Sequence, residues 1–230
     1  MRKSLLLIGI CLAAALAAAC SNADFEPMAP DNDFYSESGV NRVMDVTIMA
    51  TVKKDQDGRV YLWSKGKRIN PNEAVAFTRE MRVMSEMTIF PGGESQDYKA
   101  DIHWIEPIEE GVFTGDAKVS GTDGVDVMPD SWMTCLDDAY LTLYYSAWWG
   151  EHPVHHDFYL VSGTDPQDPY SLELRHNAHG DGTYSKEEGL ICFDINSLPP
   201  TGDASKTLSL KWHDTKGNIV TAKFEFKSRK

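Results

Sequence analysis

Two groups of histidines contain the side chains best suited to chemistry in this chain. His152, His155 and His156 lie near the start of one β-rich segment, and His176 lies at the end of another. Strand alternation places His156 and His176 on the apolar faces of their segments. If the two segments pair as antiparallel strands, these two rings could meet.

A metal site is one interpretation of these histidines, because neutral imidazole binds both Zn²⁺ and Cu²⁺. The candidate ligands are His152, His155, His156 and His176, with His179 as a further donor. Neither an H-E-x-x-H nor a C-x-x-C pattern accompanies them. A second interpretation is structural, with His176 and Asn177 fixing a loop by hydrogen bonds, and a third is a pH-sensitive cluster. We favour the structural role and predict no bound metal or cofactor.

Aromatic residues provide the second candidate site. Trp148 and Trp149 are expected in a loop beside Tyr145, followed by Gly150 and Glu151. Aromatic platforms next to carboxylates bind sugars, and aromatic residues also anchor protein interfaces. The alternative is that one of the tryptophans plugs the end of the domain. We therefore treat Trp148, Trp149 and Tyr145 as candidate binding residues.

Patterns typical of catalysis are weak in this chain. No G-x-S-x-G motif occurs, and Cys192 lies in an apolar segment without an activating neighbour. The carboxylates of Asp137 and Asp138 are adjacent, so on a strand they would point apart. The acid-rich segment Asp55–Gly58 has the composition of a turn rather than of a calcium loop. We predict that the protein is not an enzyme.

The β-rich segments predict an all-β chain with two domains. Short strands and tight turns across residues 40–112 favour a small barrel or a curled sheet. Residues 74–90 fit either a helix or a strand, and their polar–apolar alternation favours the strand. A Gly-, Asp- and Thr-rich stretch from Gly111 to Pro129 suggests a boundary, and the strands across residues 113–230 have the pattern of a β-sandwich.

The first nineteen residues have the features of a secretory signal peptide. Arg2 and Lys3 precede an apolar run that ends in small residues directly before Cys20. This cysteine resembles that of a bacterial lipobox, which implies a diacylglyceryl thioether and an acyl chain such as palmitate on Cys20. A plain secretory cleavage site is the alternative. Residues 20–39 have five acids and no base, which is typical of a flexible tether.

The charge of the chain excludes one class of partner. The net charge is −13, and removal of Arg2 and Lys3 with the signal peptide would make it −15. Such a chain is a poor partner for phosphate backbones, so we predict no nucleic acid and a membrane contact made through the lipid at Cys20. Export would permit a disulfide between Cys135 and Cys192, and two buried thiols are the alternative.

Two segments of the second domain resemble the NigD-like lipoprotein family. Ser171–Ala178 (SLELRHNA) fits L-x-[FL]-R-H-N-A, and Gly189–Leu198 (GLICFDINSL) fits G-[LV]-x-[CA]-F-D-[IL]-x-x-L. Trp132 and the Tyr140–Leu143 segment fit the family's W…YL pattern. The resemblance implies an N-terminal OB-like barrel followed by an antiparallel β-sandwich, in an outer-membrane lipoprotein that faces the periplasm or the medium. It implies no reaction and no ligand.

These observations predict a non-catalytic lipoprotein of the cell envelope that binds an envelope protein or a glycan. The alternative is a metal-binding protein or metal-dependent enzyme that uses the histidines of the second domain. A purely mechanical partner of neighbouring gene products is a third hypothesis.

Overall fold

A computed structural model describes residues 43–91 and 97–229 of the chain. In these ranges the regular secondary structure is β-strand, without helices, so the prediction of an all-β barrel and sandwich is confirmed. None of the described residues form a helix of the length and apolarity that crossing a membrane requires. The predicted signal peptide, Cys20 and the predicted tether lie outside the described residues.

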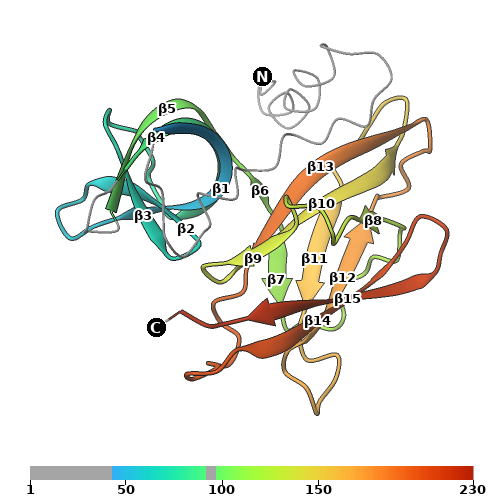
Figure 1. The fold of residues 1–230 in the computed structure, drawn as a ribbon. Coiled ribbons are helices and arrows are strands. Elements are labelled where there is room, and N and C mark those ends of the chain that lie inside the picture. Colours follow the sequence, from blue (N-terminus) through green and yellow to red (C-terminus); the bar gives the residue numbers. More distant parts are fainter. Residues whose placement is uncertain (1–42, 92–96, 230) are drawn as a thin grey trace. The chain divides into compact units, whose positions relative to one another are not determined.

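The first compact unit contains a closed barrel of five strands in the order β1-β2-β3-β5-β4 (Figure 1). β3 pairs in parallel with β5, and β1 closes the barrel by antiparallel pairing with β4. This order is the OB-like topology that the family resemblance implies. The strands are β1 (Met44–Lys54), β2 (Val60–Ser64), β3 (Lys67–Pro71), β4 (Met81–Phe90) and β5 (Asp97–Pro107).

Alternating side chains fill the barrel, with Ile48, Leu62 and Ile69 fully buried. The turn between β1 and β2 is fixed by Asp55, whose Oδ1 accepts hydrogen bonds from the backbone N of Asp57 at 3.1 Å and of Arg59 at 2.8 Å. The acid-rich segment is therefore a turn, as its composition predicts. The strand predicted within residues 74–90 is also present and begins at Met81.

Along the chain, the first compact unit ends at Ile108 and the second continues from Glu109, whereas the boundary predicted from the sequence lies between residues 112 and 113. Two short strands occupy this region, β6 (Glu109–Glu110) and β7 (Val112–Thr114). β6 pairs with β13 and β7 pairs with β11, so both belong to sheets of the second unit. Strands of two and three residues are too short to produce a visible alternation pattern, which is why this stretch resembled a linker.

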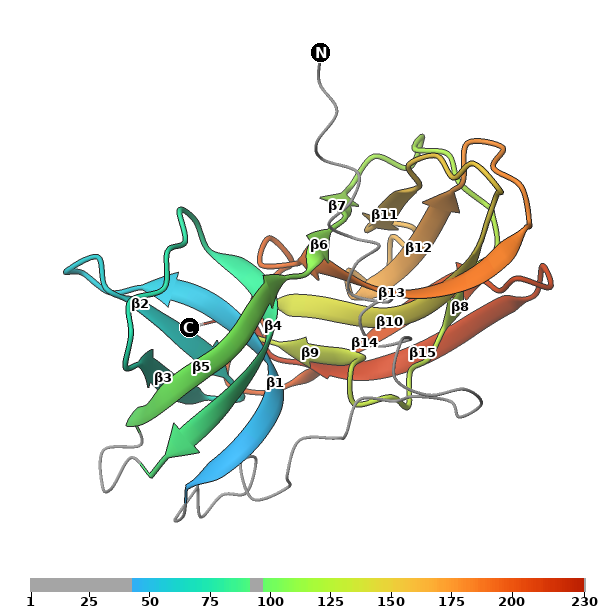
Figure 2. The ribbon, with the colours of Figure 1, turned by 90° about the horizontal axis from the view of Figure 1, so that it is seen from above.

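The second compact unit is a sandwich of two sheets (Figure 2). The first sheet has the order β6-β13-β10-β8, with β9 also paired to β10, and the second has the order β15-β14-β12-β11-β7. Three pairings are parallel, namely β6–β13, β7–β11 and β12–β14. The prediction of an antiparallel sandwich therefore holds for most pairings but not for these three. The remaining strands are β8 (Asp126–Val127), β9 (Cys135–Asp137), β10 (Tyr140–Trp149), β11 (Asp157–Val161), β12 (Ser171–Asn177), β13 (Ser185–Asp194), β14 (Lys206–His213) and β15 (Ile219–Phe226).

Cys135 and Cys192 are not joined by a disulfide, which corrects the candidate bridge of the sequence analysis. Both cysteines are register partners of Thr142, Cys135 from β9 and Cys192 from β13. They therefore lie on opposite sides of β10, separated by two strand spacings of roughly 4.8 Å each. A disulfide requires Cα atoms within about 7 Å, so the central strand prevents the bridge.

This geometry predicts that both thiols react without prior reduction. When the full chain is denatured and alkylated in the absence of a reductant, the peptides carrying Cys135 and Cys192 should be fully modified. Recovery of the two peptides as one disulfide-linked species would show that the strand order around β10 is wrong.

Candidate binding site

Two loops at one end of the sandwich contain four of the candidate histidines, His152, His155, His156 and His179. Residues 150–156 join β10 to β11, and residues 178–184 join β12 to β13. Trp148 and Trp149 are the last residues of β10 rather than part of a loop, because they continue the register with Lys186 and Ser185 of β13. This corrects the prediction. We refer to residues 148–156 and 178–184 together as the sandwich tip.

The carboxylate of Asp181 connects the two loops of the sandwich tip. Its side chain is only 5% exposed and accepts hydrogen bonds from the backbone of Gly150, Val154 and Gly182. These bonds, of which the one from Gly150 is the strongest, lower the pKa of Asp181. A Cβ atom on Gly150 would lie 2.1 Å from Asp181 Oδ1, so this close approach requires glycine.

A row of hydrogen-bonded side chains runs inward from Asp181. His156 Nε2 lies 3.2 Å from Asp181 Oδ2, and His156 Nδ1 lies 2.9 Å from His176 Nε2. His176 Nδ1 then lies 3.3 Å from the carbonyl oxygen of Gly124. Both histidines are 2% exposed. The two rings thus meet as alternation on antiparallel strands allows, because β11 and β12 are antiparallel neighbours with Phe158 opposite His176.

Two aromatic rings enclose this row of histidines. Trp149 stacks on His156 with ring centroids 3.8 Å apart and planes inclined by 6°. Phe158 stacks on His176 at 4.7 Å and 14°. The row is therefore polar along its hydrogen bonds and apolar above and below, which fixes the positions of both imidazole rings.

When both histidines are neutral, they supply one proton fewer than the three hydrogen-bond contacts of the row require. The Gly124 carbonyl and the Asp181 carboxylate can only accept, so the three contacts need three protons, whereas two neutral imidazoles supply two. Burial is the main cause that lowers the pKa of His156. Burial also lowers the pKa of His176 to about 4, and the neighbouring His156 contributes to that lowering. The two rings are therefore neutral at pH 7, and one contact of the row lacks its proton.

The candidate metal ligands do not converge. His156 and His176 lie together, but His152 is exposed, and the exposed His155 lies 3.6 Å from Asp157 Oδ1. His179 Nε2 lies 2.7 Å from the other oxygen of Asp157. Across residues 43–91 and 97–229, no group of three or more His, Cys, Asp or Glu side chains is arranged to hold a metal ion. Among these residues, the candidate histidines therefore do not form the set of ligands that the alternative function, a metal-binding protein or metal-dependent enzyme, would use.

The sandwich tip exposes three large apolar side chains. Trp148 is 39% exposed, Val154 is 45% exposed and Tyr184 is 73% exposed. Among the described residues, the other exposed large apolar side chains are Val43, Val112 and Ile219, which are far apart in the sequence. The backbone N of Tyr184 donates to the carbonyl oxygen of Trp149 at 2.7 Å, so the two aromatic segments are adjacent. Clustered exposed apolar side chains are typical of an interaction surface.

The other two predicted binding residues are differently placed. Tyr145 is 5% exposed and packs against Phe158 inside the sandwich, with ring centroids 4.8 Å apart. Burial raises the pKa of the Tyr145 phenol, so it stays protonated. Trp149 is half-buried and stacks on His156. This is the position that the alternative interpretation gives to a tryptophan that plugs the end of the domain. Of the three aromatic candidates, Trp148 is the exposed one.

Sequence reasoning missed Asp181, Val154 and Tyr184. An Asp-Gly pair such as Asp181-Gly182 is typical of an ordinary turn, and no residue beside it in sequence indicates that the carboxylate is buried against another loop. A signal for Tyr184 was available, because a lone aromatic residue in the polar segment 179–188 has few apolar neighbours in sequence.

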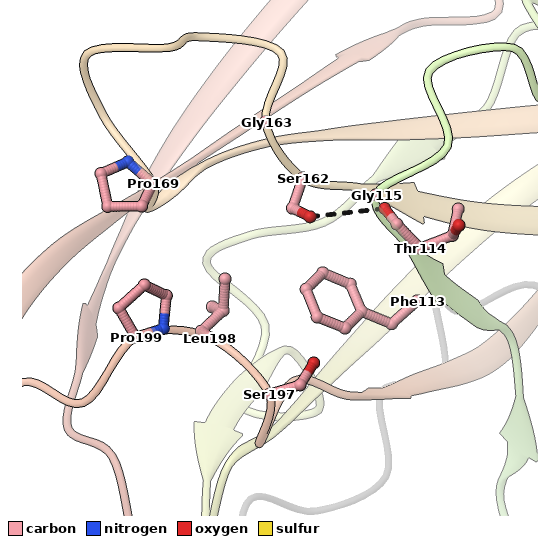
Figure 3. Close-up of a pocket in the computed structure, with 9 residues that line it drawn as sticks. All are labelled: Phe113, Thr114, Gly115, Ser162, Gly163, Pro169, Ser197, Leu198 and Pro199. Atoms are coloured by element: carbon pink, nitrogen blue, oxygen red, sulfur yellow. Dashed lines mark hydrogen bonds between the residues drawn. The ribbon is translucent and has the colours of Figure 1, made fainter.

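A shallow groove elsewhere on the second unit has a volume of about 310 Å³ (Figure 3). Phe113, Leu198 and two proline rings, Pro169 and Pro199, line it, and the hydroxyl of Ser162 is already engaged with the Thr114 carbonyl at 3.4 Å. None of the residues that line the groove is titratable. The groove therefore offers apolar contact but no general acid or base.

The fold and the sandwich tip define a two-unit all-β protein in which the ionisable groups at the end of the sandwich hold loops in place. The chain belongs to the NigD-like family: the model of the NigD-like C-terminal beta sandwich domain matches residues 105–226. None of the curated proteins compared with the chain matches it.

Solved structures share this architecture. A Parabacteroides distasonis protein provisionally described as toxin-related is 24% identical, with a TM-score of 0.66 over 80% of this chain and 94% of its own. A NigD-like immunity protein from Bacteroides caccae is 18% identical, with a TM-score of 0.55 over 79% and 96%. A Bacteroides fragilis protein provisionally described as a lipoprotein is 14% identical, with a TM-score of 0.53 over 81% and 100%. At these identities the likeness establishes the fold alone.

Proposed function

We propose that this protein is a lipid-anchored, non-catalytic binding protein of the cell envelope, and that the sandwich tip contacts a partner protein. The observation that carries the proposal is that Trp148, Val154 and Tyr184 are all exposed on the sandwich tip, whose two loops Asp181 joins. Large aromatic side chains on a rigid support lose little conformational entropy on binding and are typical anchors of protein interfaces.

The chemistry of the tip supports a binding role rather than catalysis. His156, His176 and Asp181 are buried, and each is engaged with another member of the row or with the backbone. A general base must reach a substrate proton directly or through one water molecule. Buried and mutually bonded groups instead position the loops that carry the exposed side chains.

A protein partner fits the tip better than a glycan. Sugar sites combine an aromatic platform with accessible carboxylates that hydrogen-bond the hydroxyl groups. Here one carboxylate of the sandwich tip, Asp181, is used internally. Val154 extends the apolar surface, which favours the apolar centre of a protein interface.

The location in the envelope is supported by two features. Cys20 follows a signal-like segment, and a solved relative in fold is provisionally described as a lipoprotein. We propose that the lipid on Cys20 anchors the chain in the outer membrane, with an acidic tether of about twenty residues before the barrel. The relative described as an immunity protein suggests a secreted protein or its receptor as the partner class.

The test compares two double variants of the full chain in their ability to capture a partner from native membranes. Trp148→Ala with Tyr184→Ala should reduce capture of the specific partner at least tenfold, because two anchor residues typically contribute more than about 1.4 kcal/mol together. Val112→Ala with Ile219→Ala is the matched control, since these residues are also apolar and exposed. Equal capture by both variants, or a signal only on a glycan panel, would contradict the proposal.

A further inference from the structure

The sandwich has an open strand edge that the proposed function does not use. β15 is the last strand of the sheet β15-β14-β12-β11-β7, so it pairs on one side only, with β14 (Figure 1). Within the described ranges, the backbone of residues 219–226 makes no hydrogen bond beyond this pairing. An uncovered edge of eight residues is a template for pairing with another strand.

The hairpin of β14 and β15 shows which backbone groups face the open edge. The N–H of Asp214 donates to the carbonyl oxygen of Asn218 at 2.9 Å, so these two residues form a hydrogen-bonded pair. Because hydrogen-bonded and non-hydrogen-bonded pairs alternate along an antiparallel ladder, the even-numbered residues of β15 direct their backbone toward β14. The odd-numbered residues Thr221, Lys223 and Glu225 therefore direct their N–H and C=O groups to the open edge, and their side chains are exposed.

The inner face of this edge is incompletely covered. Val220, Ala222 and Phe224 pack against the core of the sandwich but are only half-buried. A strand added at the edge extends the inner surface of the sheet, so that its own inward side chains cover these three. The edge therefore fits a strand that has apolar side chains at alternate positions, which is the pattern of β15 itself.

The charges of β15 are complementary to those of a second copy of β15. Two copies can pair antiparallel about a two-fold axis, and the direction of the free backbone groups requires that odd-numbered residues face odd-numbered residues. When the axis passes through Phe224, Lys223 of each copy lies opposite Glu225 of the other, and the two Phe224 rings face each other on the inner side. Among the described residues, neither Lys223 nor Glu225 has a side-chain hydrogen bond or an ion pair. Opposite charges and aromatic rings at facing positions stabilise strand pairing.

The other symmetric registers that overlap well are less favourable. An axis through Lys223 places two lysines opposite each other, and like charges at facing positions are destabilising. An axis through Ala222 places Lys223 opposite Thr221 and Glu225 opposite Ile219, so neither charge is paired. Charge complementarity therefore selects one register, and it selects a second copy of this chain as the occupant of the edge.

We propose that the protein forms a two-fold homodimer in which residues 221–227 pair antiparallel with the same residues of a second copy. The ion pair between Lys223 and Glu225 then forms twice. The paired segment ends before Ser228, whose backbone N–H donates to Thr201 Oγ1 of its own chain at 3.3 Å. One strand pair buries less surface than a standard protein interface, so we expect a weak dimer with a dissociation constant on the order of 10 µM.

The test is sedimentation equilibrium of the full chain in a neutrally buoyant detergent, at chain concentrations up to about 0.1 mM. The unmodified chain should dimerise. Lys223→Glu and Glu225→Lys should each weaken the dimer about tenfold, because each variant turns both ion pairs into contacts between like charges. An equimolar mixture of the two variants should regain the dimer, since every glutamate then faces a lysine. Chance sharing of a detergent micelle does not follow this charge pattern.

The matched control is Lys216→Glu, which makes the same change of charge in the exposed turn outside the paired segment and should leave the dimer unchanged. Circular dichroism establishes that each variant is folded. The proposal is overturned if the unmodified chain stays monomeric, if Lys216→Glu weakens the dimer as much as Lys223→Glu, or if the mixture fails to regain it. Because the sandwich tip is intact in all these variants, partner capture by the tip is scored separately.

Discussion

Replacement of Asp181 by alanine is expected to lower the free energy of unfolding of the sandwich and, with it, the midpoint of its thermal unfolding. The substitution leaves the backbone N–H groups of Gly150 and Val154 and the Nε2 of His156 without their common acceptor in a nearly dry site. Because His156 is neutral, Asp181 is lost as a charged hydrogen-bond acceptor and not as a member of an ion pair, and each donor that it leaves unpaired inside the folded chain carries a penalty. Calorimetric unfolding of the full chain measures the effect, as a shift of the sandwich transition by roughly 10 °C.

Asp157 provides the control for this experiment. It also contacts histidines, His179 at 2.7 Å and His155 at 3.6 Å, but its side chain is 32% exposed. Exposed ion pairs contribute about 0–1 kcal/mol, so Asp157→Ala should be nearly neutral. Similar losses in the two variants would show that Asp181 is an ordinary surface carboxylate and that the tip is not organised around it.

The second large effect is a loss of stability in mild acid. The pKa of His176 is lowered to about 4 in the folded chain, chiefly by burial, and that of His156 is lowered for the same reason. The unfolded chain takes up protons on these rings as the pH falls through about 6.5, whereas the folded chain does not. The stabilisation is therefore complete above pH 6.5 and declines as the pH falls toward 4, by about 3 kcal/mol for His176 alone.

Urea unfolding of the full chain at pH 7, 6, 5 and 4.5 measures this slope. The double variant His156→Gln, His176→Gln should be less stable at pH 7 but should lose less stability over the same range, because it removes both titrating rings. Asp181 and the turn carboxylate Asp214 have lowered pKa values, so their contributions are lost at lower pH, below the usual range of about 3.9. An increase in stability on acidification, or an unchanged slope in the double variant, would contradict the neutral buried pair.

Local sequence patterns predicted the parts of this structure that depend on alternation. They indicated a strand within residues 74–90, of which Met81–Phe90 is a strand, and allowed His156 to meet His176, because a period of two places both rings on the same face of neighbouring antiparallel segments. The strand and turn spacing favoured a small barrel or curled sheet followed by a sandwich, but the OB-like order of the barrel came from the family resemblance, since no local pattern specifies that β3 pairs with β5.

The features that were missed depend on contacts between segments far apart in the chain. Asp181 acquires its role only when residues 178–184 fold against residues 150–156, and no spacing rule links the two loops. The disulfide hypothesis failed because both cysteines flank the same strand, which is a property of sheet order. Tyrosine is a residue type that is common in binding sites, but the position of Tyr145 on β10 directs its side chain into the core.

Contact of the sandwich tip with a specific partner in the cell envelope can be tested directly in cells. The most direct measurement replaces Tyr184, which is 73% exposed, with a photoreactive phenylalanine and irradiates intact cells. The same probe at Ile219, which is 64% exposed, serves as the reference. We predict one discrete crosslinked protein from position 184 that is absent from position 219. Identical crosslinking patterns from the two positions, or none from position 184, would contradict the account.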